Sequence, residues 1–318
     1  MAYQAGDTIT AAQYNIFVNN SSSPFGYNHF AGTGSGAYGL GQTHIATVTA
    51  ADNTITASQF NSLFTGMTNI ANHTNDTLTS AGSVSAGDTV AIRSALETDL
   101  ATLAASVEGG STSATALGTN AVGTSTNAAT WNGTSTIERS VTFADADKMR
   151  HFFNAGGKIR IDPSCVTGID GDKDTVFDDL TTTATGNLDI GSKTSTRSGS
   201  GETQTTFANT TGFHDLGTSY TTLLHITSDT YPYTSNSCKI EAKLDAAVGT
   251  AVTITVKITS NDGAADFTYT SGNLSGQGTT NYRNGQHEHR LISIDTTTAS
   301  LTNAHAPSST ATVSNTTS

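Results

Sequence analysis

Charged residues are scarce in this chain of 318 amino acids. Asp, Glu, Lys and Arg together make up 13% of it, against about 25% in typical soluble proteins. Lys and Arg number 14, the formal net charge is −12, and the basic residues form no cluster along the sequence. Surfaces that bind nucleic acids need clustered Lys and Arg to replace the counterions of the phosphate backbone. We therefore expect no nucleic acid partner.

Proline, cysteine and long apolar runs are equally rare. Four prolines leave no room for long Pro-rich tracts, and no apolar run reaches the roughly 18 residues that a membrane-spanning helix needs. The opening MAYQAGDTIT has neither the basic nor the apolar region of a secretory signal. Two cysteines, Cys165 and Cys238, do not make a disulfide framework, although a single bridge between them stays open.

One octet is written twice near the N-terminus, as TITAAQYN at residues 8–15 and as TITASQFN at residues 54–61. In both copies a Thr stands three residues before a Gln, which is the spacing of a capping box at the start of a helix. An aromatic residue follows each Gln. We predict that each octet starts a helix and buries its aromatic residue, and we assign the helix-cap and docking roles to Thr10, Gln13, Tyr14, Thr56, Gln59 and Phe60.

Helical periodicity continues after the octets. Phe60, Leu63, Phe64 and Met67 follow at helical spacing and predict one apolar stripe. A third helix is predicted within residues 87–107. Residues 1–107 therefore read as a helical module and as the docking part of the chain. Residues 108–139 are rich in Gly, Ser, Thr and Ala without periodicity, which predicts either a flexible linker or an extended arm.

The pattern changes from residue 140 onward. SVTFA predicts a strand, DADKMRHFFNAGG a helix that ends at a Gly pair, KIRID a strand and KDTVFDDLTT a short helix. GFHDLG, TTLLHIT, CKIEAKL and VTITVKI then alternate with turn signals. We predict that residues 140–318 form an antiparallel β-sandwich with a short helix at its start, which gives the whole chain an α+β fold.

No segment matches a site for a metal or a nucleotide. Asp170, Asp172 and Asp174 fit positions 1, 3 and 5 of a calcium loop, but positions 6 and 12 are Thr175 and Thr181 instead of Gly and Glu. HEH at residues 287–289 puts two histidines on one face if the segment is a strand, but its spacing supplies no further zinc ligands, and a solvated strand or loop is the expected role. FAGTGSGAYGLGQ at residues 30–42 lacks the Lys-Ser/Thr of a P-loop. The sequence predicts no metal and no cofactor.

Catalytic signatures are missing as well. The sequence has no Gly-x-Ser-x-Gly elbow, no His-Glu-x-x-His and no Cys-x-x-Cys. We therefore predict no catalytic residues and a protein that is not an enzyme. TYPYTSNS at residues 230–237 sets aromatic and hydroxyl groups in a turn-rich segment, which suits either sugar binding or a turn packed on a sheet edge. Candidate surface contacts are Tyr231, Tyr233 and Tyr282.

Several segments resemble a family of virion structural proteins of tailed bacteriophages, especially marine and cyanobacterial ones. They are FFNAGGKIRI, GFHDL, YPYTSNSCKIEAKL and VTITVKITSNDG, and the N-terminal ITAAQYN, GTGSGAYGLGQ and ITASQFN are similar to the opening of those proteins. The motif residues are Phe152, Phe153, Asn154, Gly156, Gly157 and Arg160. The resemblance implies a non-enzymatic building block of the neck, collar, tail or fibre-attachment region, made in the host cytoplasm and present in several symmetric copies.

The partners that this resemblance implies are other virion proteins and copies of the same chain. An alternative from a different class is a binding module, either a fibre tip that binds a host receptor or surface glycan, or a decoration protein of the capsid. Tyr231, Tyr233 and Tyr282 are the residues on which that alternative depends. An enzyme such as a depolymerase ranks third.

Overall fold

The structure is a computed structural model that falls into a helical unit and a sheet unit, each compact in itself. No helix in the part of the chain described here is long and apolar enough to cross a membrane. The residues that the structure describes are 10–22, 25–31, 43–49, 55–74, 76–80, 82–86, 93–108, 118–127, 131, 133–154, 156–166, 172–264, 286–295 and 308–317.

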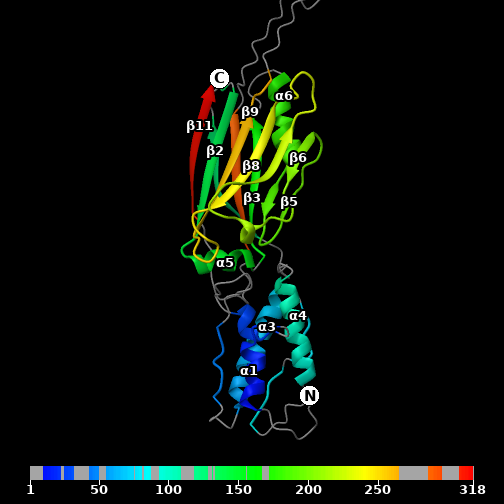
Figure 1. Ribbon diagram of the computed structural model, residues 1–318, viewed down its shortest axis with the longest axis vertical. Coiled ribbons are helices and arrows are strands. Elements are labelled where there is room, and N and C mark those ends of the chain that lie inside the picture. Colours follow the sequence, from blue (N-terminus) through cyan, green and yellow to red (C-terminus); the bar gives the residue numbers. More distant parts are fainter. Residues whose placement is uncertain are drawn as a thin grey trace, which may run out of the picture. The chain divides into compact units, whose positions relative to one another are not determined.

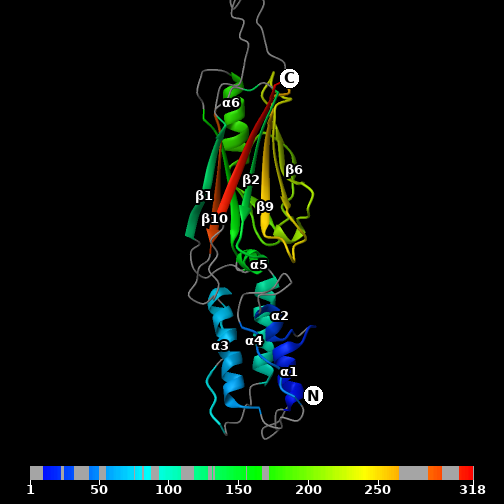
Figure 2. The same cartoon turned by 90° about the vertical axis from the view of Figure 1, so that its left-hand side faces the viewer.

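The helical unit contains α1 (Ala11–Asn19), α2 (Tyr27–Ala31), α3 (Ala57–Thr74) and α4 (Arg93–Glu108), and α5 (Ala146–Asn154) groups with it. In Figures 1 and 2, α1, α3 and α4 run alongside one another. The predicted stripe of α3 lies in the core of this unit. Its buried aromatic side chains are Tyr14, Phe17, Tyr27, Phe30, Phe60 and Phe64.

The sheet unit contains two sheets. The order of the five-stranded sheet is β1 (Gly118–Asn127), β10 (Gln286–Asp295), β3 (Lys158–Val166), β4 (Leu188–Ile190) and β5 (Ser195–Arg197). The order of the six-stranded sheet is β11 (Ser308–Thr317), β2 (Gly133–Thr142), β9 (Thr253–Asn261), β8 (Ser237–Leu244), β7 (Thr221–Thr227) and β6 (Thr203–Phe207), and Figure 1 shows its central strands side by side.

The strand pairs from β10 to β5 and from β11 to β6 are antiparallel. Helices in the N-terminal part and antiparallel sheets after them confirm the predicted α+β class. Burial alternates along β2 and β9, as expected for strands with one face in a core. The buried face of β9 carries Ile254, Val256 and Ile258.

Two sequence-based assignments are wrong. Residues 108–139 were expected to form a flexible linker or an extended arm, and a flexible linker is wrong for residues 118–127, which form β1, and for residues 133–139, which belong to β2. The strand predicted at SVTFA coincides with the end of β2, which pairs with β9 and β11. The partners of β2 lie more than a hundred residues away in the chain, so local composition cannot reveal the pairing. GFHDLG is not a strand, because Phe213–Asp215 forms the 3-10 helix η2, in which the Asp215 carboxylate accepts a hydrogen bond from the Gly212 N–H over 2.9 Å.

A helix pair lies within the sheet unit. α6 (Asp172–Asp178) continues into the π-helix η1 (Asp179–Thr185), where the predicted short helix stands. η1 packs on β3 of one sheet and on β7 and β8 of the other. The Trp131 ring meets the Phe177 ring edge-on, with 5.0 Å between centroids. This packing fixes the positions of Asp178 at the end of α6 and Asp179 at the start of η1.

Candidate functional site

Each copy of the octet begins a helix through the predicted capping box. In the first copy the Thr10 N–H donates to Gln13 Oε1 over 2.8 Å, and the Gln13 N–H donates to Thr10 Oγ1 over 3.4 Å. In the second copy the corresponding bonds between Thr56 and Gln59 measure 2.8 Å and 3.3 Å. The four side chains thus supply hydrogen-bond partners to N–H groups in the first turn of each helix.

The aromatic residues of the two octets contact each other inside the helical unit. Tyr14 is fully buried, and its ring meets the Phe60 ring edge-on at 5.4 Å between centroids, with an angle of 72°. The Tyr14 hydroxyl donates to the Gln59 carbonyl over 3.2 Å, and burial raises the pKa of Tyr14 to about 12. Phe60 is buried as well, so the predicted burial of both aromatic residues is confirmed, and these two side chains serve the core of the helical unit.

The last residue of each octet holds an extended segment of backbone. Asn15 donates from Nδ2 to the Val48 carbonyl over 2.8 Å and accepts from the Val48 N–H over 2.9 Å. Asn61 makes the same pair of bonds with Val84, at 3.0 Å and 2.9 Å. Each octet therefore begins a helix, supplies a core aromatic ring and fixes a distant segment. The role of these two asparagines was not predicted from the sequence.

A third asparagine of the helical unit acts in the same way. Asn28 on α2 donates to the Ile45 carbonyl over 2.8 Å and accepts from the Ile45 N–H over 2.9 Å. A hollow of about 870 Å³ lies beside α3 and the segment 43–46, and it is lined mainly by short hydroxyl and amide side chains. The side chains of Asn15, Asn28 and Asn61 are thus all used for contacts within the helical unit.

Residues 152–154 of the FFNAGGKIRI motif end α5, and residues 158–161 begin β3. Phe152 and Phe153 are fully buried and meet edge-on at 5.1 Å between centroids. Gly156 has a φ of 88°, and its N–H donates to the Phe153 carbonyl over 3.0 Å, while the Gly157 N–H donates to the Phe152 carbonyl over 2.8 Å. This is the predicted glycine stop of a helix. The side chain of Asn154 is buried beside it.

Arg160 of the same motif forms a two-pronged ion pair across neighbouring strands. Its Nε lies 2.6 Å from Asp189 Oδ1, and its second guanidinium nitrogen, Nη2, lies 2.8 Å from Oδ2. Arg160 stands on β3 and Asp189 on β4, at paired positions. The hydrogen bond to Asp189 raises the pKa of Arg160 above its ordinary value. The motif residues therefore have structural roles within the fold.

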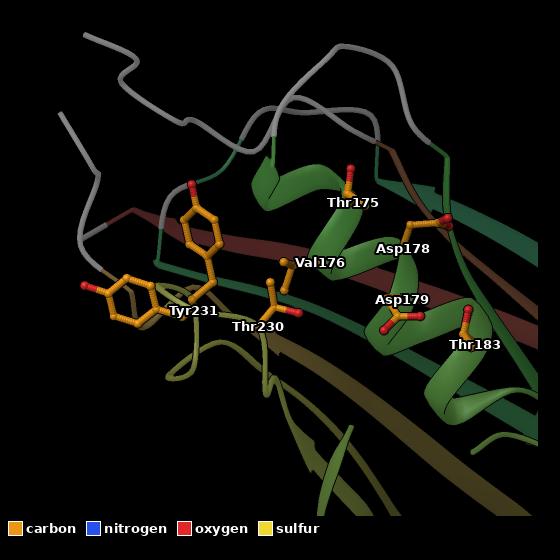
Figure 3. Close-up of a pocket in the computed structure, with 8 residues that line it drawn as sticks. Thr175, Val176, Asp178, Asp179, Thr183, Thr230 and Tyr231 are labelled. Atoms are coloured by element: carbon orange, nitrogen blue, oxygen red, sulfur yellow. The ribbon is translucent and has the colours of Figure 1, made fainter. Parts of the chain in front are cut away.

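A pocket of about 430 Å³ opens on the surface of the sheet unit (Figure 3). One wall is the α6–η1 helix, and the other is the loop that carries Thr230 and Tyr231. Tyr231 is 82% exposed, and among the described residues only Ile16 is another large apolar side chain classed as exposed. The residues that line the pocket are Thr175, Val176, Asp178, Asp179, Thr183, Thr230, Tyr231 and Tyr233.

The three tyrosines proposed as surface contacts differ in what the structure shows of their exposure. Tyr231 is exposed, as that role requires, whereas Tyr233 is only 2% exposed. The Tyr233 N–H donates to the Thr230 carbonyl over 2.8 Å, and this turn directs the two side chains differently. The peptide bond between Tyr231 and Pro232 is cis. The prediction is therefore wrong for Tyr233, and Tyr282 lies outside the described residues.

A pair of carboxyl groups stands next to this pocket. Glu202 has a φ of 54°, in the left-handed region, and its carboxyl group accepts a hydrogen bond from the Asp229 N–H. Burial, a hydrogen bond with the Asp179 side chain and the charges of Asp229 and Asp179 together raise the pKa of Glu202 to about 7. Near neutral pH, the Glu202 carboxyl group is therefore protonated in about half of the molecules. No sequence signal marks this pair.

Replacing Glu202 by Gln should remove a pH dependence of stability. The folded-state pKa of Glu202 is raised from 4.5 to about 7, so its contribution to stability is complete below pH 4.5 and is lost as the pH rises through about 7. For this half-buried group we expect the wild-type protein to lose about 1 kcal/mol over that interval. Urea unfolding between pH 4.5 and pH 8 measures the loss, and an unchanged pH slope in Glu202→Gln contradicts the assignment.

The metal sites considered from the sequence find no set of ligands among the residues that the structure describes. No group of three or more His, Cys, Asp or Glu side chains suited to a metal occurs in the described parts of the chain. Asp172 begins α6, Asp174 is buried, and Asp170 and residues 32–42 lie outside the described ranges. Cys165 and Cys238 are both buried and free, and burial raises the pKa of Cys238 to about 11.

The chain was also compared with known proteins. No protein-family model matches it, and no curated protein and no solved structure is significantly similar to it.

Proposed function

We propose that this chain is a non-enzymatic structural component of a tailed-phage virion, in its neck, tail or fibre-attachment region and in several symmetric copies. The observation that carries the proposal is the use of the repeated octet. Its capping residues, its aromatic rings and its asparagines all serve contacts within the helical unit. A motif used in this way builds a rigid module rather than a ligand site.

The resemblance of the FFNAGGKIRI segment supports the same role. In the structure this segment forms a helix stop, a buried aromatic pair and a strand with a bridging Arg, all of which are structural features. Low charge and many Ser, Thr and Asn residues suit surfaces that pack against neighbours, because few charges have to be desolvated there.

The sheet unit would form the body that contacts neighbouring subunits or projects from the particle. We infer that its two sheets face each other as a sandwich around η1. The support is that η1 packs on β3 of one sheet and on β7 and β8 of the other. Alternating burial along β2 and β9 supports it as well.

Removing α1–α4 tests the docking role that we assign to the N-terminal helices. Deletion of residues 1–117 removes α1–α4 and stops before β1. We expect the truncated chain to be absent from purified particles that incorporate the full-length chain, because the docking module is gone. Immunoblots of purified particles and circular dichroism of the soluble truncated chain provide the readouts.

Two controls make the result of this deletion interpretable. The truncated chain must keep a β-rich spectrum, and the isolated segment 1–117, added in excess during assembly, should reduce incorporation of the full-length chain. Incorporation of the truncated chain at the full-length level contradicts the docking role.

A further inference from the structure

The pocket beside Tyr231 has features that the building-block role does not explain. A large aromatic side chain that is 82% exposed leaves apolar surface in water. Tyrosine combines an apolar ring with a polar hydroxyl group, and in binding sites it presents both to a ligand. The exposed ring stands at the rim of a pocket of about 430 Å³, within the size range of small-ligand sites.

The loop that carries Tyr231 is held in place by its own hydrogen bonds. The Thr230 N–H donates to Ser228 Oγ over 3.1 Å, and the Ser228 N–H donates to the Asn236 carbonyl over 2.9 Å. The Asn236 N–H in turn donates to the Tyr233 carbonyl over 3.0 Å. Because these bonds fix the loop before a ligand arrives, binding costs less conformational entropy.

The facing wall offers hydrogen-bond acceptors at fixed positions. Asp178 and Asp179 lie at the junction of α6 and η1, and Figure 3 shows them with Thr183 on the helix that faces the Tyr231 loop. Thr182 Oγ1 donates to Asp178 Oδ1 over 2.9 Å, which leaves the second carboxylate oxygen for other donors. Ionised carboxylates only accept hydrogen bonds, so they suit a ligand that carries hydroxyl groups.

We propose that this pocket binds a neutral saccharide, with a sugar ring against Tyr231 and sugar hydroxyls donating to Asp178 and Asp179. One face of a pyranose ring is a sheet of C–H groups that matches an aromatic ring, and its rim carries the hydroxyl donors that the carboxylates need. No Lys or Arg occurs among the described residues that line the pocket. Asp178, Asp179 and the nearby Asp229 disfavour sialylated or sulfated sugars by charge repulsion.

This site does not depend on the building-block role, because it uses no residue of the helical unit. Its test is a glycan array probed with the full-length chain, followed by saturation-transfer NMR with the best neutral saccharide, with 3′-sialyllactose and with choline. We expect binding to neutral saccharides and none to 3′-sialyllactose. Loss of the aromatic ring in Tyr231→Ala should weaken binding at least about tenfold.

Three further variants test separately the aromatic ring, the Asp178 carboxylate and an exposed apolar side chain outside the pocket. Tyr231→Trp keeps an aromatic face and should retain binding, while Asp178→Asn should weaken it about threefold because an amide is a poorer acceptor than a carboxylate. Ile16→Ala, which alters an exposed apolar residue of the helical unit, should bind like the wild type.

Four results overturn the proposal. They are the absence of any neutral saccharide signal, binding confined to acidic glycans, neutral binding that Tyr231→Ala leaves intact, and Tyr231-dependent binding of choline alone, which would make this a cation site.

Discussion

Replacing Asp262 by Ala should destabilise the sheet unit by about 3–5 kcal/mol, the usual cost of leaving one member of a buried ion pair without its partner. Lys173 Nζ lies 2.9 Å from Asp262 Oδ2, and the two side chains are 1% and 0% exposed. Lys173 also donates to the Ala264 carbonyl over 3.3 Å. In Asp262→Ala the ammonium group stays buried next to a neutral methyl group.

This ion pair matters because it holds the first turn of α6 to the end of β9. Since α6 forms one wall of the Tyr231 pocket, the loss should also loosen that wall. Urea unfolding followed by circular dichroism measures the free energy change. The matched control is the double variant Lys173→Met with Asp262→Ala, which removes both charges and should recover most of the loss. A double variant as unstable as the sum of the two single variants contradicts the buried-charge explanation.

Replacing Phe60 by Ala should destabilise the helical unit by about 3–5 kcal/mol, as is typical when a core Phe is truncated. The Phe60 side chain is 3% exposed and contacts the rings of Tyr14 and Phe64, at centroid distances of 5.4 Å and 5.9 Å. The truncation leaves a cavity at the place where the two octets meet. The starts of α1 and α3 should then lose the contact between the Tyr14 and Phe60 rings that joins them.

Hydrogen–deuterium exchange with peptide-level readout is the suitable measurement, because it reports on each unit separately. We expect faster exchange in α1 and α3 of Phe60→Ala and unchanged exchange in β8 and β9. Ile16→Ala serves as the control, since Ile16 lies on α1 and is 39% exposed. Equal exchange in the wild type and in Phe60→Ala contradicts a core built on the two octets.

Local rules predicted the parts of the fold that depend on neighbours in sequence. The capping boxes, the apolar stripe of α3 and the glycine stop after α5 each depend on residues a few positions apart. β7, β8 and β9 also lie where alternation predicted strands. In each of these cases one short segment contains the capping residues or the regular spacing of apolar side chains that predicts the element.

Contacts between distant segments could not be predicted in this way. β2 is a strand because β9 and β11 flank it, and its Ser- and Thr-rich sequence shows little apolar alternation. The bonds from Asn15 to Val48 and from Asn61 to Val84 join segments 33 and 23 residues apart. The one available signal was the Asn that ends both octets.

The sequence also contains a shorter repeat, of five residues, ahead of two of the helices. AGDTI at residues 5–9 and AGDTV at residues 86–90 precede α1 and α4 respectively. α1 begins two residues after AGDTI, whereas α4 begins three residues after AGDTV.

The candidate pocket was predicted only in part. Tyr231 stood out as an aromatic residue in a turn-rich segment that suited either sugar binding or a turn packed on a sheet edge, and the structure shows it exposed. The opposite wall was predicted only as a short helix, and its closeness to Tyr231 and to Glu202 depends on how α6 and η1 pack within the sheet unit. Burial of Tyr233 likewise depends on a turn whose hydrogen bonds the sequence does not display.

Membership of a virus particle is the central claim, and mass spectrometry of purified particles tests it most directly. Particles of a tailed phage whose genome encodes this chain should be purified by density gradient and their proteins quantified against the major capsid protein. We predict peptides from both the helical unit and the sheet unit, at a constant ratio that corresponds to several copies per particle. Particles that are infectious and contain none of these peptides would contradict the account.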